Sequence, residues 1–157
     1  MTTPRTDIKP AMRKPPEGGT RSGFWKFARE LGSLSEAQRV LKIKSGFKTN
    51  VAEATKLTFD LSTEGIVRLL DISPATYGRL RKSGKTLDIT ASERLDRLAT
   101  IARIAEDVFE NKDAAAKWMA TPNAALGGVA PIMHCETEIG ARQVRRILNA
   151  LEWGGVA

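Results

Sequence analysis

The sequence predicts an all-α protein. Apolar residues recur at intervals of three and four along most of the chain, the spacing that places side chains on one face of a helix. Segments that alternate apolar and polar residues, as half-buried strands do, are missing, and so is an internal repeat. Helix-start residues such as serine and threonine precede several apolar stretches, and glycine follows them.

Residues 1–22 differ from the rest in composition and are expected to form a disordered basic arm. They are rich in proline, glycine, threonine and charge, with Ile8 and Met12 almost the only sizeable apolar groups. Such a segment buries too little apolar surface to offset the entropy lost on ordering. The arm either contacts phosphates beside a DNA-binding module or is a plain unstructured terminus.

Two helices are expected directly after the arm. Apolar residues within 24–31 have helical spacing, and Gly32 follows as a C-terminal stop signal. Ser35 and Gln38 have the spacing of a capping box, which predicts a second helix over 36–44.

A third short helix is predicted next, ending at about Leu57. Asn50 and Glu53 have the spacing of a cap in front of it. An extended connection over residues 49–59 is the alternative, because the apolar pattern there is short.

Residues 62–84 have the pattern of a helix-turn-helix unit, which is two short helices joined by a tight turn. Ser62 suits the position before the first helix. Ser73 followed by Pro74 is a strong start signal for the second helix, and Gly84 ends it. The connection of about three residues has the length that such units use.

The second helix of this unit carries the side chains expected to contact DNA. A recognition helix enters the major groove by its N-terminal half, where hydroxyls and arginines reach phosphates and base edges. Thr76 and Arg79 are three residues apart, hence on one face, and are the candidates for facing the groove. The residues expected to bind DNA are Ser73, Thr76, Arg79, Arg81, Lys82 and Lys85. Of these, Arg81, Lys82 and Lys85 would neutralise phosphates. An ordinary solvated helix pair is the alternative.

The longest apolar periodicity lies in the second half of the chain. Thr90 and Glu93 form another capping-box pattern before it, and the apolar face over 95–109 is wide. A face of this width predicts a central helix buried on more than one side. Asp113 is expected to cap the short helix that follows.

The C-terminal part is expected to contain a loop and one more helix. Residues 121–131 hold two prolines and two glycines, which favours a loop, and a last helix is predicted over about 139–153 with Gly154 as its stop. Large apolar side chains in this part indicate either a small core or a surface for a protein partner: Trp118, Met119, Leu126, Ile132, Met133 and Trp153.

The net charge of +7 is unevenly distributed. Residues 1–90 carry 17 basic and 9 acidic side chains, whereas residues 91–157 carry 8 and 9. This asymmetry favours a polyanionic partner for the first part and a protein partner for the second. Charges that cluster by chance on a solvated surface are the alternative.

Composition also excludes several classes of protein. One cysteine and one histidine allow neither a disulfide framework nor a multi-cysteine metal site, and no cofactor is expected. His134 and Cys135 are adjacent, and neighbours in sequence rarely meet as nucleophile and base. Gly127-Gly128 lacks the lysine and hydroxyl residue of a phosphate loop, so catalysis is not expected. Without a membrane span or a signal-peptide core, a cytoplasmic location is expected.

A series of short motifs then occurs in a characteristic order. They comprise Ser92, Glu93, Arg94, Leu95, Arg97, Leu98, Ala114, Trp118, Met119, Pro122, Asn123, Leu126, Gly127, Gly128, Pro131, Thr137, Glu138, Gly140, Val144, Leu148, Trp153 and Gly154. In this order they resemble the Xre/MbcA/ParS antitoxin family over about residues 60–157. The helices expected within 24–60 would complete an Xre-like N-terminal domain.

The resemblance implies a type II antitoxin encoded beside a RES-domain toxin that consumes NAD. It implies a helical DNA-binding domain over 23–90 that represses the operon, and a helical toxin-binding domain over 91–157. The partners would be the toxin and operator DNA, with a homodimer inside a hetero-oligomeric complex and no membrane. A stand-alone helix-turn-helix regulator, whose C-terminal part only dimerises, is the alternative.

Carried over by the resemblance, a toxin-binding surface would include Trp118, Pro122, Asn123, Leu126, Gly127, Gly128 and Pro131. A plug near the toxin's substrate entrance would consist of Glu152, Trp153, Gly154, Gly155, Val156 and Ala157. This chain departs from the family at His134-Cys135, where a pair of apolar residues is usual. It also departs in the second helix of the helix-turn-helix, where the family's usual arginine-rich pattern is replaced by Thr76-Tyr77-Gly78-Arg79. A glycine inside a helix costs about 1 kcal/mol relative to alanine.

Overall fold

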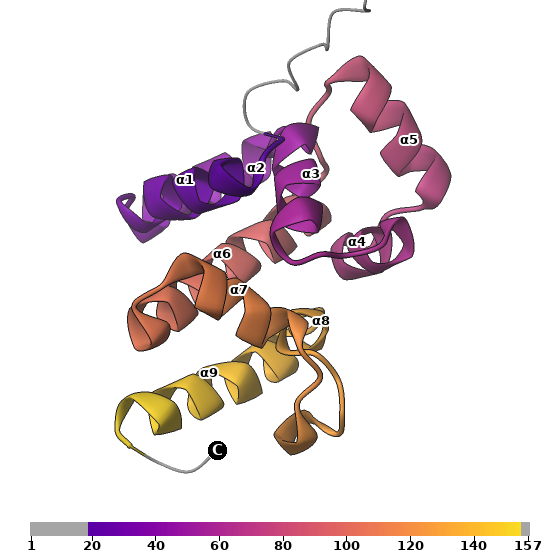
Figure 1. Ribbon diagram of the computed structural model, residues 1–157. Coiled ribbons are helices and arrows are strands. Elements are labelled where there is room, and N and C mark those ends of the chain that lie inside the picture. Colours follow the sequence, from indigo (N-terminus) through magenta and orange to yellow (C-terminus); the bar gives the residue numbers. More distant parts are fainter. Residues whose placement is uncertain (1–18, 155–157) are drawn as a thin grey trace, which may run out of the picture.

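The computed structural model describes residues 19–154, which form nine α-helices and one short 3-10 helix (Figure 1). No strand occurs within these residues, and the predicted all-α class is confirmed. The expected arm lies almost entirely in residues 1–18, outside the described residues. Helix α1 (Arg21–Gly32) begins inside the segment expected to be disordered, because the Thr20 side chain caps it by accepting a bond from the Gly23 amide.

The second and third helices test two capping predictions. Helix α2 (Glu36–Ser45) has the predicted capping box, with both Ser35–Gln38 bonds present. Helix α3 (Thr49–Thr58) is a helix and not an extended connection. Its cap position is occupied by Lys48, which makes no side-chain cap bond, so the predicted start at Asn50 was wrong.

The helix-turn-helix is present as predicted. Helix α4 (Thr63–Leu70) is capped by Ser62, and α5 (Pro74–Ser83) is capped by Ser73, each through its hydroxyl oxygen. Asp71 ends the first helix in the left-handed conformation, which turns the chain sharply toward the second.

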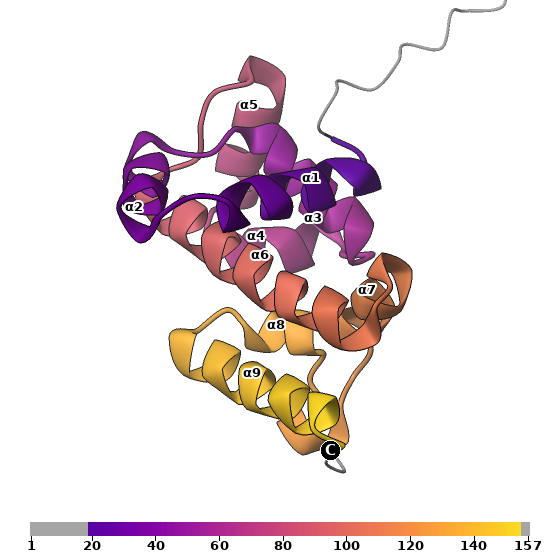
Figure 2. The same ribbon diagram turned by 90° about the vertical axis from the view of Figure 1, so that its left-hand side faces the viewer.

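Helix α6 (Ile89–Phe109) is the centre of the molecule. It packs against α1, α2 and α4 on one side and against α7 and α9 on the other, as Figure 2 shows. The predicted burial on more than one side is confirmed by fully buried side chains along its length, including Leu95, Leu98 and Ile101. The helix starts two residues earlier than a cap at Thr90 would place it, because the Asp88 carboxylate accepts the amide of Ala91.

The C-terminal helices lie on the far side of α6. Helix α7 (Lys112–Ala120) is capped by Asn111, which corrects the expected cap at Asp113. The predicted loop contains a 3-10 turn, η1 (Ala124–Leu126). Helix α8 (Pro131–His134) starts at the proline that was expected to close that loop, and α9 (Glu138–Glu152) matches the predicted last helix to within a residue.

Gly140 explains how closely the first turn of α9 approaches α8. A Cβ atom at this position would lie 1.8 Å from the backbone oxygen of His134. The Gly140 amide also donates to the Thr137 hydroxyl, which caps the helix. Only a residue without a side chain allows this approach.

We expect Gly140→Ala to lower the free energy of unfolding by about 1–3 kcal/mol, the usual cost of forcing extra atoms into a packed site. Chemical denaturation followed by circular dichroism measures it. The matched control is Gly78→Ala in α5, where nothing lies within 4 Å of the added Cβ. That variant should gain up to about 1 kcal/mol from helix propensity. A Gly140→Ala protein as stable as the parent would contradict the close approach.

Candidate DNA and toxin interfaces

The exposed side of α5 and the turn that follows carry a group of cations. The side chains of Arg79, Lys82 and Lys85 are exposed, and none of them forms an ion pair with any described residue. They therefore remain available to neutralise phosphates.

The two hydroxyl candidates lie at the N-terminal end of the same helix. The Ser73 oxygen accepts the Thr76 amide at 3.1 Å, and its hydroxyl donates to the Thr76 oxygen at 2.8 Å. Ser73 is exposed and Thr76 is half-buried. Both hydroxyls are thus engaged in starting the helix, at the end that a recognition helix directs into the groove.

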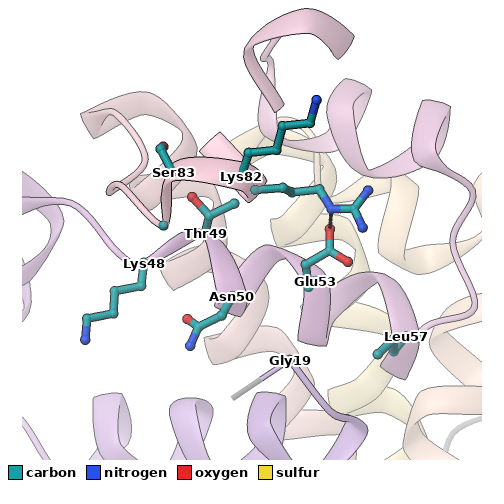
Figure 3. Close-up of a pocket in the computed structure, with 10 residues that line it drawn as sticks. Gly19, Lys48, Thr49, Asn50, Glu53, Leu57, Lys82 and Ser83 are labelled. Atoms are coloured by element: carbon teal, nitrogen blue, oxygen red, sulfur yellow. Dashed lines mark ion pairs between the residues drawn. The ribbon is translucent and has the colours of Figure 1, made fainter. Parts of the chain in front are cut away.

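Arg81 has a different environment from the other cations of α5. Its Nε lies 3.0 Å from Oε1 of Glu53 on α3, the ion pair that is dashed in Figure 3. Its guanidinium also lies 5.7 Å from the ring centre of Tyr77. Arg81 therefore joins α5 to α3, in addition to any phosphate contact.

Tyr77 completes this connection from the buried side of α5. Its ring is almost fully buried, and its hydroxyl donates to the same Glu53 carboxylate. Burial, reinforced by that carboxylate, raises the pKa of Tyr77. Glu53 thus contacts two side chains of α5 and fixes the orientation of that helix on α3.

A cleft between α3 and α5 adds a further cation to the basic surface. Lys48 and Lys82 both line it, together with Ser83 and Glu53 (Figure 3). Lys48 is 34 positions before Lys82 in the sequence. Sequence reasoning missed it because only the packing of α5 on α3 brings the two residues to one cleft.

The chain leaving α5 is held against the loop between α2 and α3. The Thr49 hydroxyl donates to the Lys85 carbonyl at 2.6 Å, and the Leu87 amide donates to the Phe47 carbonyl at 2.8 Å. The Phe47 amide in turn donates to the buried hydroxyl of Ser92 at 3.0 Å. Ser92 is therefore a buried residue of α6 that ties this helix to the loop before α3.

Two arginines of α6 link the helix-turn-helix to the C-terminal helices. Arg94 donates to the Leu69 carbonyl of α4 at 3.2 Å. Arg97 donates to Glu93 at 2.7 Å and to the Cys135 carbonyl at 3.1 Å, and its Nε lies 3.4 Å from a carboxylate oxygen of Glu138. The arginines of the Ser92–Leu98 motif therefore contact both halves of the molecule.

The expected toxin-binding residues divide into buried and exposed groups. Leu126 and Pro131 are buried, and Trp118 is half-buried with its ring 5.7 Å from that of Phe109. Asn123 is half-buried and caps η1. The exposed members are Pro122, Gly127, Gly128, Glu152, Trp153 and Gly154. Gly155, Val156 and Ala157 lie outside the described residues.

The Gly127-Gly128 pair forms a tight turn. The φ angles of the two glycines are +67° and +83°, a left-handed conformation that other residues rarely adopt. The turn closes on Asn123, whose carbonyl accepts the Gly128 amide at 2.9 Å and whose amide donates to the Val129 carbonyl at 3.2 Å. The diglycine is therefore explained by the shape of the turn.

Sequence reasoning missed an exposed face of α9 that leads to the chain end. Ile139, Arg142, Arg146 and Trp153 are spaced so that they share one side of the helix. All four are exposed, Ile139 at 64% and Trp153 at 86%. Of the six large apolar residues that the sequence singled out in this half, Met119, Leu126 and Ile132 are buried and Trp153 is the exposed one.

His134 and Cys135 do not form a nucleophile–base pair. The His134 ring is hydrogen-bonded to Gln143 of α9, whereas Cys135 is fully buried in the core. Burial raises the pKa of the Cys135 thiol from 9.0 to about 12, which suppresses the reactive thiolate. Among the described residues, no group of three acidic, histidine or cysteine side chains could hold a metal, and no helix is long and apolar enough to cross a membrane.

Comparison with known proteins gives two adjoining matches. Residues 38–99 match the antitoxin Xre-like helix-turn-helix domain, and residues 105–154 match the antitoxin Xre/MbcA/ParS C-terminal toxin-binding domain. The junction falls within α6, the helix that contacts both halves. The fold thus defines an antitoxin in which a helix-turn-helix domain is joined to a toxin-binding domain.

Two relatives agree with this class. An Antitoxin Xre of Yersinia enterocolitica serotype O:8 / biotype 1B is 32% identical over 129 residues, 80% of this chain and 87% of the relative. An Antitoxin Xre of Photorhabdus laumondii subsp. laumondii is 36% identical over 94 residues, 59% of this chain and 63% of the relative. The chain belongs to the Xre/MbcA/ParS antitoxin family, whose members act as regulators rather than enzymes.

The environment of Cys135 predicts its chemistry. We expect Ellman's reagent to react slowly with the native protein near pH 8 and rapidly after denaturation. Because the folded pKa is raised from 9.0 to about 12, the thiol's contribution to stability is present below about pH 9 and is lost as the pH rises toward 12. Cys135→Ala should therefore show a smaller loss of stability over this range. Rapid native labelling would contradict the burial.

Proposed function

We propose that this antitoxin neutralises a RES-domain toxin that consumes NAD, and that it represses its own operon as a homodimer. The observation that carries the first part is the exposed end of α9, where Trp153 stands in solvent within the segment that matches a toxin-binding domain. A large aromatic ring at the edge of a helix is the kind of residue on which protein interfaces depend most.

The toxin-binding surface would extend from Trp153 to other exposed groups of the C-terminal half. The tight turn at Gly127 and Gly128 presents backbone without side chains, which lets a partner approach closely. Arg142 and Arg146 of α9 favour an acidic partner surface. Glu152, Trp153 and the residues after them would enter the opening through which the toxin takes its substrate.

Repression would depend on α5. Arg79, Lys82 and Lys85 supply exposed positive charge, and Ser73 and Thr76 lie at the end that enters the major groove. Arg79 lies one turn after Ala75 on the exposed side and would contact base edges, where arginine discriminates guanine. The contact of Arg81 and Tyr77 with Glu53 would hold the helix at the angle that docking requires.

Co-expression with a RES-domain toxin tests the first part of the proposal. The full chain should restore growth and co-purify with the toxin, and Trp153→Ala or removal of residues 152–157 should abolish rescue while leaving operator binding intact. The control is Leu57→Ala, another exposed apolar residue, on α3. Full rescue by both altered forms would contradict the plug, and no rescue by the parent chain would favour the stand-alone regulator.

Arg79→Ala is expected to weaken operator binding by about 1–3 kcal/mol, the range for one lost base contact. Gel-shift titration against operator and random DNA measures this loss, which should be larger for the operator. The matched control is Arg29→Ala, an exposed arginine on α1. Equal operator affinity for the Arg79 variant and the parent would show that this residue does not contact the operator. Both variants should still protect cells from the toxin.

A further inference from the structure

Helix α2 lies on α6 without placing any of its own residues fully in the core. Among the helices of residues 19–154, it alone has no buried residue. It is attached by Ile43, which is half-buried against the core, and by Arg39, which donates to both carboxylate oxygens of Asp96 at 2.9 and 2.6 Å and to Thr100 at 3.0 Å. This contact settles which side of α2 faces α6 and leaves the opposite side in solvent.

The solvent side of α2 is apolar in its middle. Ala37, Val40, Leu41 and Lys44 recur at three- and four-residue spacing and form one stripe. Val40 is 48% exposed and Leu41 is 67% exposed. Single exposed apolar residues are common on protein surfaces, but two adjacent ones on a helix with no fully buried residue indicate a surface that a partner covers.

The charges at the two ends of this stripe fit a second copy of the same helix. Glu36 lies at the N-terminal end of α2, and Lys44 lies near its C-terminal end. Both are four residues from Val40, so an antiparallel pair centred there brings Glu36 of each copy level with Lys44 of the other. The antiparallel arrangement also sets each helix's positive end beside the negative end of its neighbour.

We propose that α2 forms the homodimer interface, with two copies packed antiparallel through Ala37, Val40 and Leu41 about a twofold axis. This inference rests on the proposed function, in which a dimeric repressor binds an operator. A twofold interface uses the same patch on both copies, and the charge pattern of α2 is self-complementary in that sense.

The position of α2 allows the dimer to keep its other surfaces free. Figure 2 shows α2 at one edge of the molecule, with α5 above it and α9 on the far side of α6. Pairing through α2 would therefore leave α5 and α9 uncovered. A twofold pair would present two α5 helices to the two half-sites of a palindromic operator.

Sedimentation equilibrium of the full chain alone, without toxin or DNA, tests the interface. The parent should be a dimer, and Leu41→Asp should raise its dissociation constant by about tenfold or more, since a charge would be buried without a partner. Leu57→Asp is the matched control and should leave the dimer intact. Circular dichroism establishes that each variant remains folded.

Charge exchange provides the sharper test. Glu36→Lys and Lys44→Glu should each weaken the dimer, and the double variant should restore it. Both changes oppose the helix dipole, so rescue by the double variant reports pairing between copies rather than helix stability. A dimer unaffected by Leu41→Asp, a failure of the double variant to restore it, or a monomeric parent would each overturn the interface. If cells that express the toxin still grow with the Leu41→Asp variant, neutralisation does not require this interface. The two proposals can then be judged separately.

Discussion

The structure depends on the burial of one long helix from opposite sides. Helix α6 has apolar side chains around most of its circumference, and no single layer of helices could cover them. The N-terminal helices cover one side and α7 and α9 cover the other. The two family-matched segments are therefore joined through a shared core, with α6 running from one into the other.

Polar contacts between distant positions then fix the orientation of the parts around α6. Arg94 and Arg97, three residues apart, contact the helix-turn-helix and the C-terminal helices respectively. Arg39 attaches α2 through Asp96, which is almost fully buried, and Glu53 orients α5 through Tyr77 and Arg81. Buried charges are tolerated only when they are paired, so each contact admits few alternative arrangements.

The surfaces left over have distinct chemistry. The exposed side of α5 is cationic, the end of α9 carries a solvent-exposed tryptophan, and the outer stripe of α2 is apolar between opposite charges. They lie on different parts of the molecule (Figures 1 and 2). One small chain therefore has room for three kinds of contact, with polyanion, with a protein partner and with its own copy.

The sequence by itself determined the helices, because apolar spacing, capping serines and terminal glycines are local signals. It located the capping box at Ser35 and the helix-turn-helix from Ser62 to Gly84. It misplaced three helix starts, where Lys48, Asp88 and Asn111 occupy the cap positions. Asp88 and Asn111 are good cap types that lie two residues before the predicted caps, so local signals did not separate the two choices. Lys48 makes no side-chain cap bond, so the start of α3 has no local signal of this kind.

Only the tertiary structure decided which candidate side chains are available to a partner. Leu126 and Pro131 were indistinguishable in sequence from Pro122 and Trp153, yet the first pair is buried and the second is exposed. Arg81 and Arg79 differ because Glu53 lies within reach of one alone. The exposure of a side chain and its ion pairs depend on contacts between residues far apart in the chain. The spacing of residues along one helix does not reveal those contacts.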